Sequence, residues 1–567
     1  MKRLAAVALV ALAVANADMS AATAATKRRV VAKATAAPAT IFVNDRGAMV
    51  PLSAKAPVGT AESVEAEFGR QLQLLLKTSL KPGITALLVV DASTGVPIFA
   101  LRPDAAMNPA SNVKMIATAT ALAVLGANHR FATQLLGPVA GVDPHRIAGD
   151  IYLLGSYDPT FDTDGLHALA TTLHAQGVTH IDGNIVFGQA DRDGPYGARL
   201  PLDVVATTRG KAPEVLLWPG DQQTVVINRA KTVRKGKTRI AIAQRQLPSK
   251  DYQLTITGTI AVGNRITKTV AVQQRPRFAG QWLRWELSQL GIEVTGNIAI
   301  EPLHDYLQRL ASQGQFAVAL ATRTSATVGE LVTKINKRSI NWLADRLVAV
   351  AAGFEHNITP TLARGVAEMR EWLQTRAAID PTSLTIDTGS GLSYRTKISP
   401  QQLIAVIRNA GGFTFDAPAY AATWTQSLSI GGKDGTLAHR FLAPQFADRI
   451  HAKTGTLSNV VALSGLLLTN PARPLAFALV TNKHARGYKT RIRRAHEQVM
   501  AALSAYVAKH DGVAFVPPAA SPQGRTTTAT AATTAAASAP ARDSRDTVTD
   551  DETAEDLDKA LGVTPAP

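Results

Sequence analysis

Ser111 and Lys114 are the first residues along the chain that could work together as a nucleophile and a base. They lie in the segment Asn-Pro-Ala-Ser-Asn-Val-Lys at 108–114, where Pro109 suits the entrance of a helix. The apolar residues that follow, up to Leu125, predict that this helix is buried. Residues three apart share a helix face, so the lysine amine would lie beside the serine hydroxyl as a base beside a nucleophile. The same spacing is common on surface helices, but it occurs once in this chain.

Two further short motifs decide between these interpretations. Ser339 and Asn341 form a Ser-x-Asn motif, and Lys453 begins a Lys-Thr-Gly motif; each occurs once. The order Ser-x-x-Lys, Ser-x-Asn, Lys-Thr-Gly resembles the signature of the serine penicillin-recognising enzymes, which are the penicillin-binding proteins and the serine β-lactamases.

The resemblance implies catalytic roles for five side chains. Ser111 would be the acylated nucleophile. Lys114 would be its base, provided that burial and the nearby charge of Lys453 lower its pKa enough to make it neutral. Ser339 would relay a proton to the leaving amine, and Asn341 would hold Lys114 and the substrate amide. Which lysine or serine acts as the base in such sites is left open by the resemblance.

The third motif implies a place for the substrate. Lys453 and Thr454 would bind a substrate carboxylate, and Gly455 would keep the strand flat enough for the substrate to lie against it. The backbone N–H groups of Ser111 and Thr456 would form the oxyanion hole.

Further landmarks narrow the family. They are a long interval after the first motif, the segment 155–160, the Gly/Ser-rich loop 387–393, and the segments 431–437 and 452–457. Over 62–510 the chain resembles class C low-molecular-mass penicillin-binding proteins, which are D-alanyl-D-alanine carboxypeptidases/endopeptidases. This resemblance implies a multidomain α/β protein, with a β-lactamase/transpeptidase-like α/β domain split by a large, mostly β insertion. It also implies acyl-enzyme chemistry on peptidoglycan stem peptides and acylation by β-lactams such as penicillin.

Two positions depart from the family pattern. Tyr394 stands where the family commonly has arginine after Gly-Ser-Gly-Leu-Ser, and Arg395 follows it. Ser458 stands where some members carry glutamine. Both positions face the substrate in relatives, so Tyr394, Arg395 and Ser458 are expected to set the preference for the peptide side chain.

Composition and texture divide the chain into segments. Residues 1–17 have the charged start, apolar run and small-residue cleavage site of a secretory signal. The expected organisation is a signal peptide at 1–17, a linker at 18–61, the transpeptidase-like domain at 62–128 and 274–512, a mostly β inserted module at 129–273, and a disordered tail at 513–567.

The bulk numbers limit the classes of function. The 567 residues contain no cysteine, which removes disulfides, thiol catalysis and zinc–thiolate sites. The net charge of +17 attracts anionic partners, but export and the lack of a basic–aromatic motif argue against nucleic acid. We therefore expect a periplasmic or extracytoplasmic protein, peripherally associated with the envelope, that needs no cofactor or metal.

Two other functions remain open. One is a serine β-lactamase or esterase on the same fold; the serine at 339 argues against it, because class C β-lactamases usually carry tyrosine there. The other is a non-catalytic peptidoglycan-binding protein, against which the complete set of motif residues argues.

Overall fold

The computed structural model describes residues 69–510 except 76, 82, 140–142, 189–198, 218–223, 248–251, 273–274, 357 and 447. The predicted signal peptide, linker and tail lie outside this part of the chain. The chain forms two compact units. The split unit contains the described residues up to Asn128 and those from Val328 onward, and the inserted unit contains the described residues of His129–Thr327.

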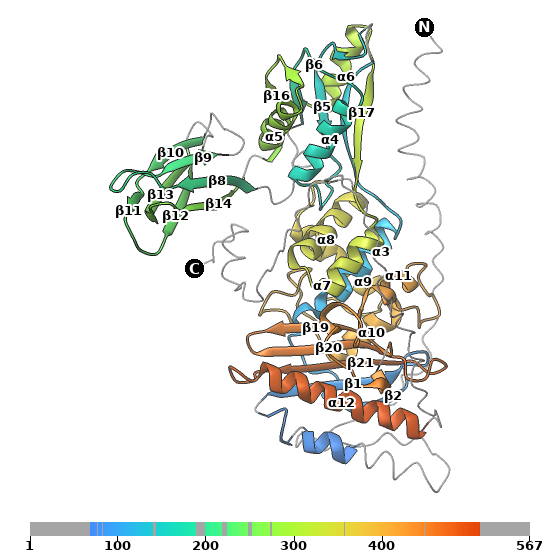
Figure 1. Cartoon of the computed structure of the whole chain (residues 1–567). Helices are drawn as coiled ribbons and strands as arrows, with labels where there is room; N and C mark the ends of the chain where they lie inside the picture. The colour runs from blue at the N-terminus through green and yellow to red at the C-terminus, as the bar shows by residue number, and fades with distance from the viewer. Residues whose placement is uncertain are drawn as a thin grey trace, which may run out of the picture. The chain divides into compact units, whose positions relative to one another are not determined.

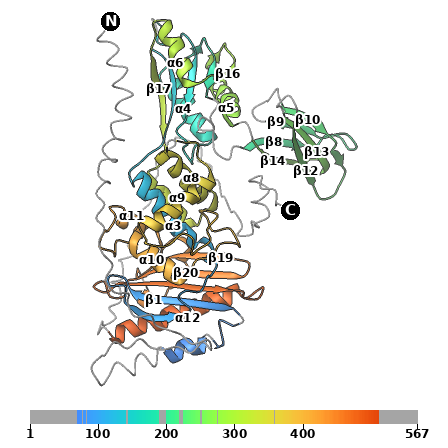
Figure 2. The same ribbon diagram turned by 180° about the vertical axis from the view of Figure 1, so that it is seen from behind.

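A six-stranded antiparallel sheet is the centre of the split unit. Its order is β18 (Ser429–Ile430), β19 (Ile450–Leu457), β20 (Val460–Leu467), β21 (Leu475–Asn482), β1 (Ile84–Asp91) and β2 (Pro97–Leu101). Every residue of β20 and β21 is buried, because helices cover both faces. Figures 1 and 2 show α12 (Lys489–His510) on one face and α10 (Pro400–Ala410) and α3 (Lys114–Leu125) on the other.

The helix α3 is buried on nearly all sides, with 10 of its 12 residues buried. It packs against α7 (Val328–Arg338), α8 (Asn341–His356) and α9 (Leu362–Thr375), all from the second half of the split unit. The short 3-10 turn η1 (Ala110–Val113) precedes it and contacts β19 and β20. The apolar run after Lys114 thus forms a buried helix, as the sequence indicates.

The inserted unit is built around a five-stranded sheet. Its order is β16 (Ile298–Ile300), β7 (Ile185–Phe187), β5 (Ile151–Leu154), β3 (Ala132–Pro138) and β17 (Ala317–Thr324). The helices α4 (Thr163–Ala175) and α5 (Arg275–Gln289) contribute to its main core, and α6 (Leu303–Ser312) contributes Tyr306 and Leu310 to a smaller one. Three short strands, β15 (Glu293–Val294), β6 (His180–Ile181) and β4 (Arg146–Ile147), form a second sheet.

Residues 199–272 of this unit form what we call the β lobe. One of its sheets has the order β10 (Thr224–Asn228), β13 (Tyr252–Ala261), β11 (Lys231–Val233), with β12 (Arg239–Gln246) also pairing with β13. The other has the order β14 (Arg265–Ala271), β8 (Arg199–Val205), β9 (Glu214–Leu217). Their inner faces share an apolar core that includes Leu202, Leu254 and Ile256.

The inserted unit extends further along the chain than the predicted limit of 129–273. Residues 275–324 pack with it because their strands pair there: β17 with β3, β16 with β7, and β15 with β6. The apolar residues Ala279, Leu283 and Leu287 of α5 belong to its core as well. The helical texture after 273 therefore does not mark the return to the split unit, which resumes at Val328.

Within the described residues, no helix combines the length and the apolar character that crossing a bilayer requires.

Candidate active site

Ser111 and Lys114 are presented at the junction of η1 and α3. The Nζ atom of Lys114 lies 3.0 Å from Oγ of Ser111. Ser111 is partly exposed, whereas Lys114 has no exposed surface. The hydroxyl thus faces accessible space, while the amine beside it lies in the protein interior.

Lys114 has two more hydrogen-bond acceptors. Its Nζ donates to Oδ1 of Asn341 at 2.6 Å and to the backbone carbonyl of Ser390 at 2.7 Å. Burial lowers the pKa of Lys114 to about 7, and the charge of Asp345 acts in the opposite direction. An amine with this pKa is substantially neutral at physiological pH, so it is able to accept a proton from the neighbouring hydroxyl.

The second lysine and second serine form a similar pair. Nζ of Lys453, on β19, donates to Oγ of Ser339 at 2.9 Å and to the carbonyl of Thr454 at 3.0 Å. Lys453 is fully buried, and burial, followed by repulsion from Lys114, lowers its pKa well below the ordinary value. Ser339 lies in the turn between α7 and α8 with a φ of 58°, a left-handed conformation that costs energy for a residue with a side chain.

Two glycines allow the surrounding segments to approach the η1 turn. A Cβ atom on Gly455 would lie 2.5 Å from the carbonyl oxygen of Pro109, so β19 approaches η1 there by backbone alone. A Cβ on Gly391 would lie 2.1 Å from the carbonyl oxygen of Ala110, and Gly391 also has a φ of +74°. Side chains at these two positions would push their segments away from Ser111.

One edge of β19 is open beside this turn. Its neighbour β18 pairs only with His451 and Ala452. Among the described strands, β20 is the one that pairs with β19 from Lys453 to Leu457. An extended peptide is able to add to such an edge by backbone hydrogen bonds. Thr454 donates its hydroxyl to Thr436 at 2.8 Å, and Thr456 accepts from Arg493 of α12 at 3.0 Å.

The structure also brings Tyr394 and Ser458 together. The hydroxyl groups of the two residues are 2.6 Å apart, and the backbone N–H of Ser458 donates to the tyrosine oxygen at 3.3 Å. Arg395 instead pairs with Asp387 at 3.1 Å, and its side chain is 81% exposed. The segment 387–395 is therefore joined to the β19–β20 turn through Tyr394.

Sequence reasoning missed Asp345 and Ser390. Oδ1 of Asp345 accepts from the backbone N–H of Ser390 at 2.7 Å, which fixes the carbonyl that receives Lys114. Burial raises the pKa of Asp345, while Lys114 and the hydrogen bond to Ser390 lower it. The available signal was an acidic residue one turn after Asn341, just before the apolar stretch 347–354 of the same helix.

One group of side chains in the described residues has the donor atoms for a metal ion: His356, Glu368 and Glu371. His356 Nε2 lies 3.0 Å from a carboxylate oxygen of the buried Glu368. His356 ends α8, whereas Asn341 begins it. An imidazole partner for a buried carboxylate accounts for this group without a metal, and the expectation of a metal-free site stays a prediction.

Comparison with known proteins places this geometry in a family. Residues 72–505 match the D-Ala-D-Ala carboxypeptidase 3 (S13) family, and the chain belongs to it. It is therefore a serine-type peptidase, and the predicted family is confirmed.

Individual relatives agree. The chain is 28% identical over 448 residues to the D-alanyl-D-alanine carboxypeptidase of Actinomadura sp. (strain R39). The aligned region covers 73% of this chain and 80% of the relative. It is 27% identical over 225 residues to the D-alanyl-D-alanine carboxypeptidase DacB of Haemophilus influenzae, covering 38% of this chain and 42% of the relative. The crystal structure of penicillin binding protein 4 from H. influenzae matches 79% of this chain and 100% of its own, with a TM-score of 0.56 and 18% identity. This last likeness confirms the predicted α/β fold class.

Proposed function

We propose that this chain removes the terminal D-alanine from peptidoglycan stem peptides, and cuts peptide cross-links between them, through an acyl-enzyme on Ser111. The observation that carries the proposal is the 3.0 Å contact between Ser111 Oγ and the buried Nζ of Lys114, whose pKa is about 7. A serine hydroxyl is a weak nucleophile until a base takes its proton, and here the base is adjacent.

Acylation would proceed in two stages. Neutral Lys114 takes the proton of Ser111 while Oγ attacks the carbonyl carbon between the two D-alanines. The negative charge then formed on the substrate oxygen is stabilised by the backbone N–H groups of Ser111 and Thr456. The amide C–N bond breaks when the leaving nitrogen receives a proton from the Ser339 hydroxyl, and the proton that Lys114 took restores this hydroxyl by way of Lys453, whose Nζ lies 2.9 Å from Ser339 Oγ. Neutral Lys114 then takes a proton from the water that attacks the ester, and it returns a proton to Oγ of Ser111 as the shortened peptide leaves.

The substrate would lie along the open edge of β19. Lys453 and Thr454 would receive its carboxylate, Gly455 would leave room for its backbone, and Asn341 would hold both Lys114 and the substrate amide. A cross-linked peptide presents a longer chain, and Tyr394, Arg395 and Ser458 are proposed to contact its side chain.

Mass spectrometry after penicillin treatment tests the nucleophile. The adduct is expected on the peptide that contains Ser111 and is expected to disappear in Ser111→Ala. An adduct elsewhere would refute the assignment. Slow hydrolysis of the adduct is expected, because rapid turnover of penicillin would indicate a β-lactamase. Release of D-alanine from purified muropeptides, and loss of cross-linked dimers, test the substrate.

We also propose that the protein acts outside the cytoplasm. The support is the signal-like sequence at 1–17, together with a substrate that belongs to the cell wall. The N-terminal sequence of the protein isolated from cells tests this: cleavage after Ala17 is expected, and an intact Met1 on a cytoplasmic protein would contradict it. The proposed boundaries of the linker and the tail are open to limited proteolysis, which should cut within 18–61 and 513–567 before it cuts the units.

A further inference from the structure

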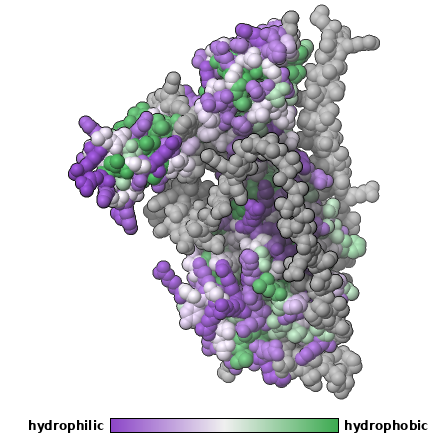
Figure 3. Space-filling view, viewed as in Figure 1, coloured by the Kyte–Doolittle hydropathy of each residue, from purple (hydrophilic) through white to green (hydrophobic). Residues whose placement is uncertain are grey.

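The β lobe carries a large share of the charge of the chain. Residues 199–272 contain thirteen Lys and Arg residues and four Asp and Glu residues, a net charge of +9 out of the +17 of the whole chain. Figure 3 shows hydrophilic side chains gathered at the end of the lobe where β11 lies. Catalysis on a stem peptide at Ser111 gives no reason for this concentration of positive charge.

These cations are available for an external partner. Among the described residues of the lobe, the cation with an ion-pair partner is Arg265, which pairs with Asp203. Lys231, Arg239 and Arg245 are exposed and have no such partner in the described part of the chain. Cations left unpaired in this way repel one another and do not stabilise the fold, so their charge is available to an anionic ligand.

Strand register places the cations along one face. Arg239 and Arg245 lie an even number of positions apart on β12, so they lie on the same face of the strand. Both are exposed, as are Ala241 and Ala243 between them on that face. Ile240 and Ile242, on the opposite face, pack against the core of the lobe. At about 3.4 Å per residue, the two arginines lie about 20 Å apart along the strand.

Neighbouring strands extend this face. Thr259 of β13 is the register partner of both Arg239 on β12 and Lys231 on β11, so an arginine, a threonine and a lysine form a row across the sheet. Thr255 and Thr257 are opposite Ala243 and Ala241. We call this surface, formed by Lys231, Arg239, Ala241, Ala243, Arg245, Thr255, Thr257 and Thr259, the β12 face. It is lined with hydroxyls and carries positive charge at both ends.

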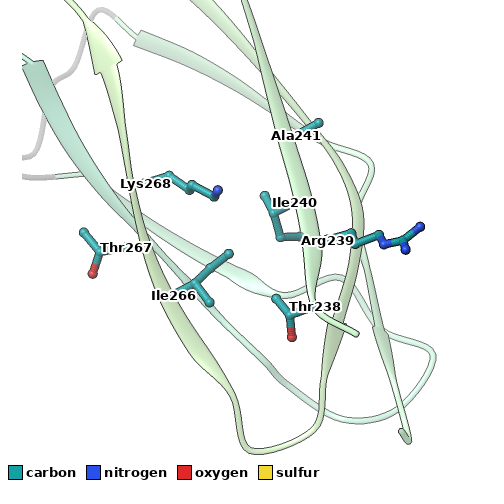
Figure 4. A pocket seen from close by; sticks show the side chains of 7 residues that line it. All are labelled: Thr238, Arg239, Ile240, Ala241, Ile266, Thr267 and Lys268. Carbon is teal, nitrogen blue, oxygen red and sulfur yellow. The ribbon is translucent and has the colours of Figure 1, made fainter. Parts of the chain in front are cut away.

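A groove runs along the free edge of β12. It has a volume of about 580 Å³ and lies between β12 and β14, each of which forms the edge of its sheet (Figure 4). In Figure 4 Ile240 and Ile266 line its interior, and Lys268 comes from the opposite strand. Lys268, which is exposed, points into the groove, whereas Arg239 points away from it on the other side of β12.

We propose that the β12 face binds a linear, phosphate-bearing polymer that lies along β12 and contacts Arg239 and Arg245 at the same time. Arginine forks, a lysine and threonine hydroxyls are donors that match phosphate oxygens. A flat membrane surface fits less well, because binding to an interface needs exposed aromatic or long aliphatic side chains next to the cations. The hairpin between β11 and β12, residues 234–238, has none. Nucleic acid fits less well too, because the β12 face has no aromatic side chain on which a base could stack.

The distance between the two arginines makes chain length the critical variable. Fluorescently labelled inorganic polyphosphate longer than 20 Å is expected to bind the full-length protein tightly at low salt and to be released as salt rises. Pyrophosphate is too short to reach both arginines and is expected to compete only weakly. If pyrophosphate competes as well as the long chain at equal phosphate concentration, the proposed binding mode is wrong.

A pair of matched double variants tests the location. Arg239→Ser with Arg245→Ser is expected to weaken polyphosphate binding about tenfold or more. The slope of log K against log salt concentration is expected to fall by the amount that corresponds to about two phosphate contacts. Arg486→Ser with Arg494→Ser removes the same charge from exposed positions of the split unit and is expected to leave binding within twofold. Equal effects of the two pairs would show that only net charge matters, which would overturn the proposal.

Binding measurements with three other anionic ligands distinguish the classes of partner. Vesicles of phosphatidylglycerol, single-stranded DNA and polyglutamate of matched charge are each expected to bind more weakly than polyphosphate. Tighter binding of any one of them would assign the face to a membrane, to nucleic acid or to carboxylates, and would refute the proposal. Acylation by penicillin serves as the folding control and is expected to be unchanged in both double variants, so a loss of polymer binding is distinguishable from a failure of the active site.

Discussion

At the scale of single residues, the state of Lys114 controls the chemistry. Three oxygen acceptors hold its Nζ, and burial sets its pKa near 7. Because only the neutral amine accepts a proton, the rate of penicillin acylation is expected to rise with pH through about 7 and then to level off. Stopped-flow acylation from pH 5 to 9 measures this profile. A rate that falls as pH rises through 7 would contradict it.

The same site predicts the result of removing the base. Lys114→Met keeps a long unbranched side chain in the buried position but has no amine, so acylation is expected to fall by about 10²–10⁴-fold. The melting temperature checks that the fold is kept. Lys337→Met is a matched control, because Lys337 pairs with Asp434 and has no proposed part in catalysis. Near-normal acylation of Lys114→Met would mean that another group activates Ser111.

Tyr394 occupies one of the two positions at which the sequence is expected to depart from the family pattern, and the structure pairs it with the other, Ser458. Tyr394→Phe removes the hydroxyl that contacts Ser458 and keeps the ring. We expect cleavage of stem peptides to change several-fold in KM, while acylation by penicillin, which lacks the stem-peptide side chain, changes less than twofold. Arg395→Ala is expected to have the same pattern, with a larger effect on stem peptides than on penicillin. The fold should tolerate this change, because the exposed ion pair of Arg395 with Asp387 contributes little to stability. Equal losses on both substrates would show that the tyrosine supports the common chemistry instead.

The sequence predicted the residues of the three motifs well, but it did not predict the residues that hold Lys114 in place. Ser111, Lys114, Ser339, Asn341 and Lys453 meet as their motifs indicate, since each motif is short and contiguous. Asp345 and Ser390 could not be found in the same way. Ser390 acts through its backbone N–H and its backbone carbonyl, which no residue type encodes. The carboxylate of Asp345 accepts that N–H, a contact that its spacing from Asn341 does not reveal.

At the scale of elements, glycines determine how closely the loop and β19 approach η1. Gly391→Ala would place a methyl group 2.1 Å from the carbonyl oxygen of Ala110 and would also strain a φ of +74°. Acylation is expected to fall by about 100-fold or more, because displacements near 1 Å at a reacting centre cost about that much. Gly487→Ala is the matched control, since it has a φ of +86° and open space around its Cβ. If both variants acylate equally slowly, the strain of φ alone explains the loss.

Element boundaries show where pattern reasoning fails. The apolar run after Lys114 predicted α3 because a fully buried helix has a simple signature. The end of the inserted unit was predicted at 273, where helical texture begins, but α5 packs on the inserted unit. Helical periodicity shows that one face of a helix is buried, but it does not show which sheet the helix packs on. In the same way, the sequence of β17 predicts a strand but does not show that its partner is β3.

At the scale of the whole molecule, a buried histidine links stability to pH. His496 has no exposed surface, and its Nε2 lies 2.9 Å from Thr481 Oγ1. Burial lowers its pKa to about 3, and repulsion from Arg440 and His484 adds to the shift. In the unfolded chain the imidazole of His496 is protonated near pH 6.5, whereas in the folded protein it stays neutral until about pH 3. Protonation therefore favours the unfolded state, and the fold loses stability progressively as pH falls from about 6.5 toward 3.

Thermal unfolding tests this contribution. His496→Gln has no group that titrates in this range, and its melting temperature is expected to fall less than that of the wild type between pH 7 and pH 4. The difference in stability between pH 7 and pH 4 corresponds to about 3 kcal/mol. The exposed His145→Gln is the control for a change in histidine count. Parallel curves for all three proteins would show that His496 does not control the acid sensitivity.

The interior strand β1 has a consequence for biosynthesis. One of its neighbours, β2, follows within a few residues, but the other, β21, pairs residue for residue from Ile84↔Asn482 to Asp91↔Leu475. At about 5–20 residues per second, a ribosome needs about 20–80 s to make the chain between these partners. For that time β1 has an unpaired edge and apolar faces without a cover, which is the state in which strands associate with other chains. The inserted unit, whose strands are contiguous in the sequence, is able to fold during this interval, so the segment that holds Ser111 is expected to be the part of the nascent protein most dependent on a chaperone.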